Sequence, residues 1–206
     1  MQEYDMFSKT TKLPDVLFRE AALRLIELAS FRGDFYRCLL THGRLVDRFP
    51  DEVQHQMNVA LTFIKMKRFQ DAKKVLHDII EYDHSNGVAL AYYGYIIKVD
   101  EDDIEHGVAN MKKGLRLSGD QISDAKFYYH LGHGLMFLGR SAEAYAVFEH
   151  AASLGLFLSA QQRSMYNIEG LTGQLSVSGF SIRAEATRVL HSEPKSMEGG
   201  KPKNYR

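Results

Sequence analysis

Apolar residues recur along this chain at spacings of three and four, which is the period of an amphipathic helix. No proline lies between Pro50 and Pro194. Proline breaks helix interiors because it removes a hydrogen-bond donor and clashes with the preceding turn. Asn86-Gly87 lies between two helical patterns rather than between the alternating runs of a β-hairpin. The pattern therefore predicts an all-α chain.

A set of large and small residues predicts that these helices are paired. After residue 125, an aromatic residue, a Leu-Gly pair and an Ala-x₃-Phe-x₂-Ala set follow one another at the spacing of a tetratricopeptide helix pair. The members of the set are Tyr128, Leu131, Gly132, Leu135, Ala144, Phe148 and Ala151. Its small residues would let two antiparallel helices approach closely.

Weaker copies of this pattern occur upstream. The copies begin at residues 19, 53, 87 and 125, so the intervals are 34, 34 and 38 residues, against about 34 for a tetratricopeptide repeat. We expect a right-handed tetratricopeptide-type solenoid of about four helix pairs, closed by a helix that covers the last repeat. The predicted organisation is an N-terminal segment (1–18), four repeats (19–52, 53–86, 87–124 and 125–158), a closing helix (159–171) and a disordered tail (172–206).

Composition excludes several classes of protein. The chain has 26 Lys and Arg and 26 Asp and Glu, so bulk charge gives no reason to expect nucleic acid as a partner. The single cysteine, Cys38, excludes an internal disulfide framework, and its repeat position predicts a buried thiol. The longest near-apolar stretch, residues 88–97, is about half of the roughly 20 residues that a membrane helix requires. The first residues lack the apolar core of a signal peptide.

Each candidate chemical site in the sequence has a simpler explanation. His130 and His133 could share a helix face, but no third metal ligand lies at a suitable spacing. The acidic stretch 100–103 is better explained as the start of a helix than as a calcium loop. Residues 132–134, Gly-His-Gly, fit helix packing, and His191-Ser-Glu193 lacks the downstream histidine of an iron site. We expect no catalytic, metal-binding or cofactor-binding residues.

The repeats instead predict a concave groove, lined by the first helix of each pair. Groove positions two, five, nine and twelve of three repeats hold Gln54, Met57, Leu61, Ile64, Val88, Ala91, Tyr95, Lys98, Lys126, Tyr129, His133 and Met136. This aromatic and apolar surface with two lysines suits an extended peptide or a packed domain.

We expect roughly half of these positions to be core between repeats. The candidate peptide-binding residues are Gln54, Met57, Tyr95, Lys98, Lys126, Tyr129, His133 and Met136. The clamp by which chaperone-tail-binding tetratricopeptide proteins hold a terminal carboxylate needs asparagine at such ninth positions. Here these positions are Leu61, Tyr95 and His133, so that clamp is missing.

Five segments carry a more specific resemblance. They read LPDVLFREAALRL (13–25), AKKVLHDII (72–80), YYGYIIK (92–98), KFYYHLGHGLMFLGRSAEAYAVFEHAASLGLF (126–157) and QQRSMYNIEGL (161–171). Together they resemble the tetratricopeptide region of the aspartyl/asparaginyl β-hydroxylase family, over residues 11–174. The resemblance implies luminal repeats of a type II membrane protein of the endoplasmic reticulum. Such repeats pack on a 2-oxoglutarate- and iron-dependent oxygenase domain, which hydroxylates Asp or Asn in EGF-like domains, and help form its substrate cleft.

The chain departs from that family at both ends. No transmembrane helix precedes the repeats, and the segment after residue 174 reads LSVSGFSIRAEATRV where the family has a tryptophan-containing segment. The remaining residues are too few for an oxygenase domain, to which Fe(II) and 2-oxoglutarate would belong. We therefore expect a truncated isoform or an imperfect gene model without oxygenase activity.

Alternative functions remain open at this point. The favoured hypothesis is a non-catalytic interaction module that binds a polypeptide, such as an EGF-like substrate or an oxygenase-bearing chain. A second is a fragment that functions only within a full hydroxylase, and a weaker third is a generic cytosolic scaffold. The resemblance implies the endoplasmic reticulum, whereas the absence of a targeting signal implies the cytoplasm if the chain is expressed as written.

Overall fold

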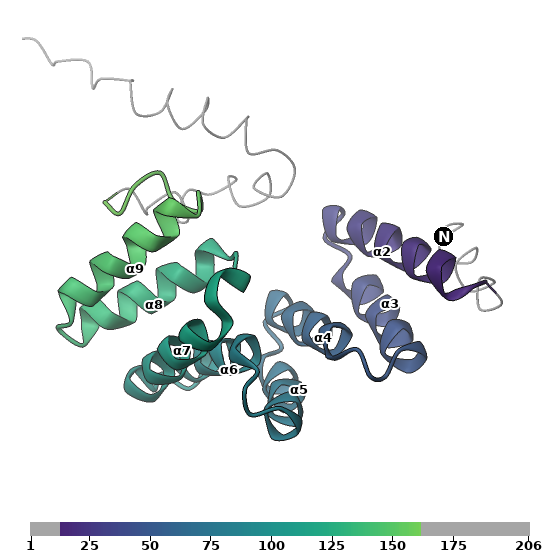
Figure 1. The fold of residues 1–206 in the computed structure, drawn as a ribbon, viewed down its shortest axis with the longest axis horizontal. Helices are drawn as coiled ribbons and strands as arrows, with labels where there is room; N and C mark the ends of the chain where they lie inside the picture. The colour runs from purple at the N-terminus through teal and green to yellow at the C-terminus, as the bar shows by residue number, and fades with distance from the viewer. Residues whose placement is uncertain (1–12, 162–206) are drawn as a thin grey trace, which may run out of the picture. The chain divides into compact units, whose positions relative to one another are not determined.

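The computed structural model describes residues 13–161, and within them every regular element is a helix. The α-helices are α2 (Asp15–Phe31), α3 (Phe35–Arg48), α4 (Val53–Lys65), α5 (Phe69–Tyr82), α6 (Gly87–Asp100), α7 (Ile104–Ser118), α8 (Ala125–Phe137) and α9 (Ser141–Ser153), with a short 3₁₀ turn η2 (Gly119–Gln121). Each helix packs on the next, most closely within the pairs α4–α5, α6–α7 and α8–α9 (Figure 1). The prediction of an all-α, tetratricopeptide-type fold is confirmed.

The predicted boundaries can be compared with these helices. The limit at residue 18 falls inside α2, which begins at Asp15 directly after Pro14. A proline is well tolerated there because the first N–H groups of a helix have no acceptor within it. Residues 159–161, the start of the predicted closing helix, are not helical. The rest of that helix (162–171), the predicted tail (172–206) and residues 1–12 lie outside the described part of the chain.

Acidic and amide side chains fix where four of the helices begin. Asp34, Asn86, Asp103 and Asp124 each accept a hydrogen bond from a backbone N–H in the first turn of α3, α6, α7 and α8 respectively. Such caps satisfy donors that would otherwise lack a partner. For α7 the bond joins His106 N to Asp103 Oδ1 at 3.1 Å. Asp103 is thus the N-cap of α7, as predicted for the acidic stretch 100–103, whereas Asp100 and Glu101 end α6 instead.

The closest helix contact lies between α6 and α7 and depends on glycine. A Cβ atom at Gly114 would lie 2.3 Å from the backbone nitrogen of Ala91, and one at Gly94 would lie 2.6 Å from that of Met111. Gly87 meets α7 equally closely, at 2.4 Å from Ser118 N. Because these neighbours are backbone atoms, no side-chain rotation could make room. The two helices can approach this far only without side chains at these positions.

The apolar core has two separate parts. The larger runs from α4 to Ala160 and includes the fully buried Tyr128, Phe127 and Phe148. The smaller lies between α2 and α3 and has only four buried members, namely Phe18, Ala22, Leu25 and Leu45. The first helix pair therefore has little apolar burial of its own to hold it in place.

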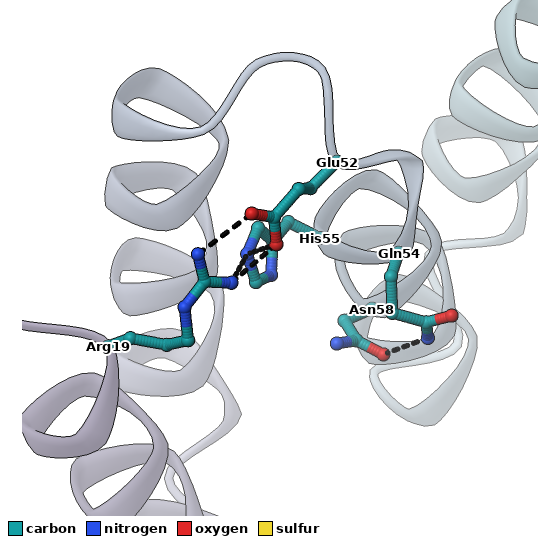
Figure 2. A network of polar contacts seen from close by, with 5 residues as sticks. All are labelled: Arg19, Glu52, Gln54, His55 and Asn58. Carbon is teal, nitrogen blue, oxygen red and sulfur yellow. Dashed lines mark hydrogen bonds and ion pairs between the residues drawn. The ribbon is translucent and has the colours of Figure 1, made fainter. Parts of the chain in front are cut away.

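A polar network links this first pair to the second (Figure 2). The guanidinium of Arg19, on α2, donates to both carboxylate oxygens of Glu52, which precedes α4, and its Nη2–Oε1 distance is 2.7 Å. The Glu52 carboxylate also lies 3.1 Å from His55 Nε2. The guanidinium covers the ring of Phe49 at 4.1 Å. A planar guanidinium can pair with a carboxylate through two hydrogen bonds and stack on a ring at the same time, which the ammonium of a lysine cannot do.

Gly114→Ala should destabilise the fold, because its methyl group would overlap the backbone of α6. We expect a loss of about 1–3 kcal/mol in the free energy of unfolding, measured by urea denaturation. Gly43→Ala is the matched control, since Gly43 lies inside α3 with no other heavy atom within 4 Å of the added Cβ. That variant should gain about 0.5–1 kcal/mol. Equal effects at both positions would contradict the assigned close contact.

Glu52→Gln should loosen the first helix pair while leaving the others unchanged. The substitution keeps the side-chain length but removes the charge that pairs with Arg19, so amide hydrogen exchange in α2 should become faster. Exchange in α6 to α9 should stay the same. Glu27→Gln provides the control, because it breaks only the exposed Arg24–Glu27 pair within α2. Unchanged exchange in α2 of the Glu52 variant would refute the linking role.

Candidate functional site

The predicted groove residues of α6 and α8 come together on one surface. Helix α6 packs against α8 as well as against α7. Along α8, Lys126, Tyr129, His133 and Met136 are spaced by three or four residues and therefore lie on one side of the helix. We call the surface formed by Tyr95, Lys98, Lys126, Tyr129, His130, His133 and Met136 the α6–α8 face.

The predicted binding residues differ in how far they are available to a partner. Tyr95 and Met57 are buried at 2% and 3% exposure and belong to the larger core. Lys98 is 9% exposed. On α8, Lys126 and Tyr129 are half-buried, while His133 and Met136 are exposed. A partner that binds the α6–α8 face would therefore contact mainly side chains of α8, together with the end of the Lys98 side chain.

The α4 part of the predicted groove is separate from this face. Helix α4 packs mainly on α3 and α5. Gln54 is exposed there and its amide donates to Asn58 Oδ1 at 3.2 Å, one turn along the same helix (Figure 2). Gln54 thus has its hydrogen-bond partner on its own helix, while Met57 is buried in the larger core that also contains Tyr95.

Aromatic rings make up the floor of the α6–α8 face. The rings of Tyr129 and His133 are stacked, with centroids 5.9 Å apart and planes at 18°. His130 lies edge-on to both Tyr129 and Tyr95, at 5.6 Å and 5.3 Å. His130 was not among the predicted binding residues, since the repeat template selects only the ninth position, His133. His130 lies four residues after Lys126, and residues at this spacing share one side of a helix, so the sequence did contain a signal for it.

Basic groups gather on this face and influence one another. Burial, together with the neighbouring Lys98, Lys126 and His133, lowers the pKa of His130 to about 4. The His130 imidazole is therefore neutral at pH 7. Burial also lowers the pKa of Lys98, against the opposing influence of Asp102. The face can offer positive charge and imidazole N–H groups to an acidic or polar partner.

A second surface, on α2, is less selective. It is a shallow depression lined by Val16, Arg19, Glu20, Leu23, Arg24 and Glu27. Its two arginines and two glutamates balance in charge, and Arg19 and Arg24 are already paired with Glu52 and Glu27. Nothing in this surface selects one class of ligand over another.

The remaining candidates from the sequence are structural. Cys38 is 3% exposed, and burial raises the pKa of its thiol, so the predicted buried thiol is confirmed. Gly132 lies inside α8, where an added Cβ would overlap the ring of Phe148, which confirms its packing role. His77, Asp78 and Glu81 lie close together on α5, but all three are exposed. Among residues 13–161, no helix is both long and apolar enough to cross a bilayer.

Comparison with known proteins extends this description. Over 173 residues the chain is 30% identical to the Homo sapiens aspartyl/asparaginyl beta-hydroxylase, a match that covers 82% of this chain and 23% of that protein. The Mus musculus protein of the same name matches equally well. This chain is similar to the aspartyl/asparaginyl beta-hydroxylases. The resemblance predicted from the sequence is therefore confirmed, and the chain spans about a quarter of the length of these relatives.

Solved structures support the fold alone. A crystal structure of MamA aligns with a TM-score of 0.50 at 18% identity, covering 81% of this chain and 98% of that chain. At this identity the likeness concerns the arrangement of helices and carries no function. No protein-family model matches the chain.

Another buried histidine, His42 in α3, should make stability depend on pH. His42 is 6% exposed, and burial, aided by His55 and Lys65, lowers its pKa to about 4. In the unfolded chain the pKa returns to 6.5, so the unfolded state binds a proton first as the pH falls. The stability that the fold gains from keeping His42 neutral is therefore fully present above pH 6.5, and it is lost as the pH falls toward 4.

The free energy of unfolding should therefore decrease between pH 6.5 and 4.5, by up to about 1.4 kcal/mol per pH unit from this residue. His42→Gln should make that decrease shallower, as measured by urea denaturation at a series of pH values. His77→Gln is the control, because 54% of the His77 side chain is exposed. If both variants keep the slope of the original protein, His42 is not the titrating group.

Proposed function

We propose that these repeats form a non-catalytic module that binds a polypeptide, either an EGF-like domain or the oxygenase domain of a hydroxylase. The observation that carries the proposal is the α6–α8 face, which offers exposed His133 and Met136 beside half-buried Tyr129 and Lys126. Aromatic and long side chains of this kind supply most of the affinity in protein interfaces. The described residues contribute helix packing and this surface, which suit binding.

Similarity supports the choice of partner. The match to the hydroxylases covers 82% of this chain, and the family resemblance implies repeats that lie beside an oxygenase domain and its EGF-like substrate. It also favours a second candidate function, in which this stretch acts as one part of a peptidyl-aspartate or peptidyl-asparagine hydroxylase in the lumen of the endoplasmic reticulum. In both cases the repeats bind a polypeptide and leave the chemistry to another domain.

Binding can be measured directly by calorimetry with two purified partners, a folded EGF-like domain and an isolated oxygenase domain of the human hydroxylase. At least one should bind, and Tyr129→Ala should weaken that binding at least tenfold because it removes the ring stacked on His133. Tyr82→Ala is the matched control, since the Tyr82 side chain on α5 is 86% exposed and lies away from the face. The purified chain with iron, 2-oxoglutarate and the EGF-like domain should show no turnover.

Three results would contradict the proposal. If neither the EGF-like domain nor the oxygenase domain binds, the assigned partners are wrong. Equal loss of affinity in the Tyr129 and Tyr82 variants would move the binding surface away from the α6–α8 face. Turnover of 2-oxoglutarate by the purified chain would show that it is an enzyme.

A further inference from the structure

Lys98 is held in an unusual environment for a lysine. Its aliphatic stem passes between glycines of the two neighbouring helices, since a Cβ at Gly107 would lie 2.6 Å from Lys98 Cβ and one at Gly134 would lie 2.8 Å from Lys98 Cε. The whole residue is only 9% exposed. Lysines in folded proteins are rarely buried to this extent unless their charge is paired.

Within residues 13–161, the Lys98 ammonium forms no hydrogen bond and no ion pair. Neighbouring acidic groups are engaged elsewhere, because Asp100 accepts from Gln70 and Glu101 pairs with Lys73. Asp102 attracts the ammonium without bonding to it. In the described part of the chain, the stem of Lys98 is thus buried while its ammonium has no hydrogen-bond or ion-pair partner and can attract an oppositely charged group.

The surroundings of Lys98 concentrate the same sign of charge. Lys98, Lys126 and His133 all act on His130 in the direction expected of nearby positive groups. This local excess stands out because the chain as a whole has no net formal charge. The rings of Tyr95 and Tyr129 both contact His130, so aromatic side chains border this group of positive charges.

We propose that Lys98 binds the carboxylate of an Asp or Glu side chain within the polypeptide held on the α6–α8 face, with His130, Lys126 and His133 flanking it. The ammonium supplies charged N–H donors to the carboxylate, and the aromatic rings of the face lie beside them. A side-chain carboxylate fits better than a chain terminus, because the asparagines of a terminal-carboxylate clamp are replaced by Leu61, Tyr95 and His133. This inference rests on the proposed function and specifies the ligand class of the same face.

The probe is a pair of end-blocked octapeptide pools that differ only in Asp or Asn at a central position, with uncharged residues elsewhere. Fluorescence anisotropy at low salt should show at least tenfold tighter binding of the Asp pool. Lys98→Met should abolish this preference, because methionine can occupy the channel between the glycines without the charge. Lys113→Met, an exposed lysine on α7, is the matched control and should stay within twofold of the original protein.

Two further measurements separate a binding role from a structural one. Since Lys98→Met removes a buried unpaired charge, its midpoint in urea should be equal to or higher than that of the original protein, whereas a merely structural lysine would lower it. An Asn pool with a free C-terminal carboxylate should bind no better than the blocked Asn pool. Binding of that pool as tightly as the Asp pool would overturn the assignment to a side chain.

The inference and the proposed function can fail independently. No preference for Asp over Asn, or the same loss in Lys98→Met and Lys113→Met, overturns the carboxylate site. If the EGF-like or oxygenase domain still binds the Lys98 variant with unchanged affinity, the interaction module stands and the carboxylate site fails. If the Asp pool binds through Lys98 while neither domain binds, the site stands and the assigned partners fail.

Discussion

The backbone contact between α6 and α7 is the constraint on which the rest of this structure depends. Helices with ordinary side chains lie 8–10 Å apart, and here glycines along both helices remove the atoms that enforce such spacing. The pairing brings Gly107 against Lys98, and Gly134 of α8 lies against the far end of the same side chain. The burial of Lys98, on which the proposed carboxylate site depends, therefore arises because two neighbouring helices approach this lysine at glycines.

The central position of α6 also explains its composition. Helices α5, α7 and α8 all pack against it, and most of its residues are buried. A helix covered on several sides needs apolar residues around its whole circumference rather than along one stripe. Residues 88–97, the most apolar stretch of the chain, therefore reflect burial within a helical solenoid.

Much of the fold could be predicted from the sequence because its determinants are local and repeated. Gly107, Gly114 and Gly132 occupy the small-residue positions of their repeats, and each meets its partner helix as that position requires. The face was harder to predict, because exposure depends on which neighbouring repeat lies alongside. The same template position that leaves His133 exposed buries Tyr95, and the burial of Lys98 follows from Gly134, a residue 36 positions further along the chain. His130 was overlooked because the template assigns it no groove position.

The two parts of the apolar core have a mechanical consequence. The first helix pair is joined to the second by the packing of α3 on α4 and by the polar contacts of Arg19, Glu52 and His55, whereas α6 and α7 are held by close packing along their length. Charged contacts at a partly exposed position weaken as salt screens them, while close packing does not. High ionic strength would therefore weaken the link between the first two helix pairs more than it weakens the contact between α6 and α7.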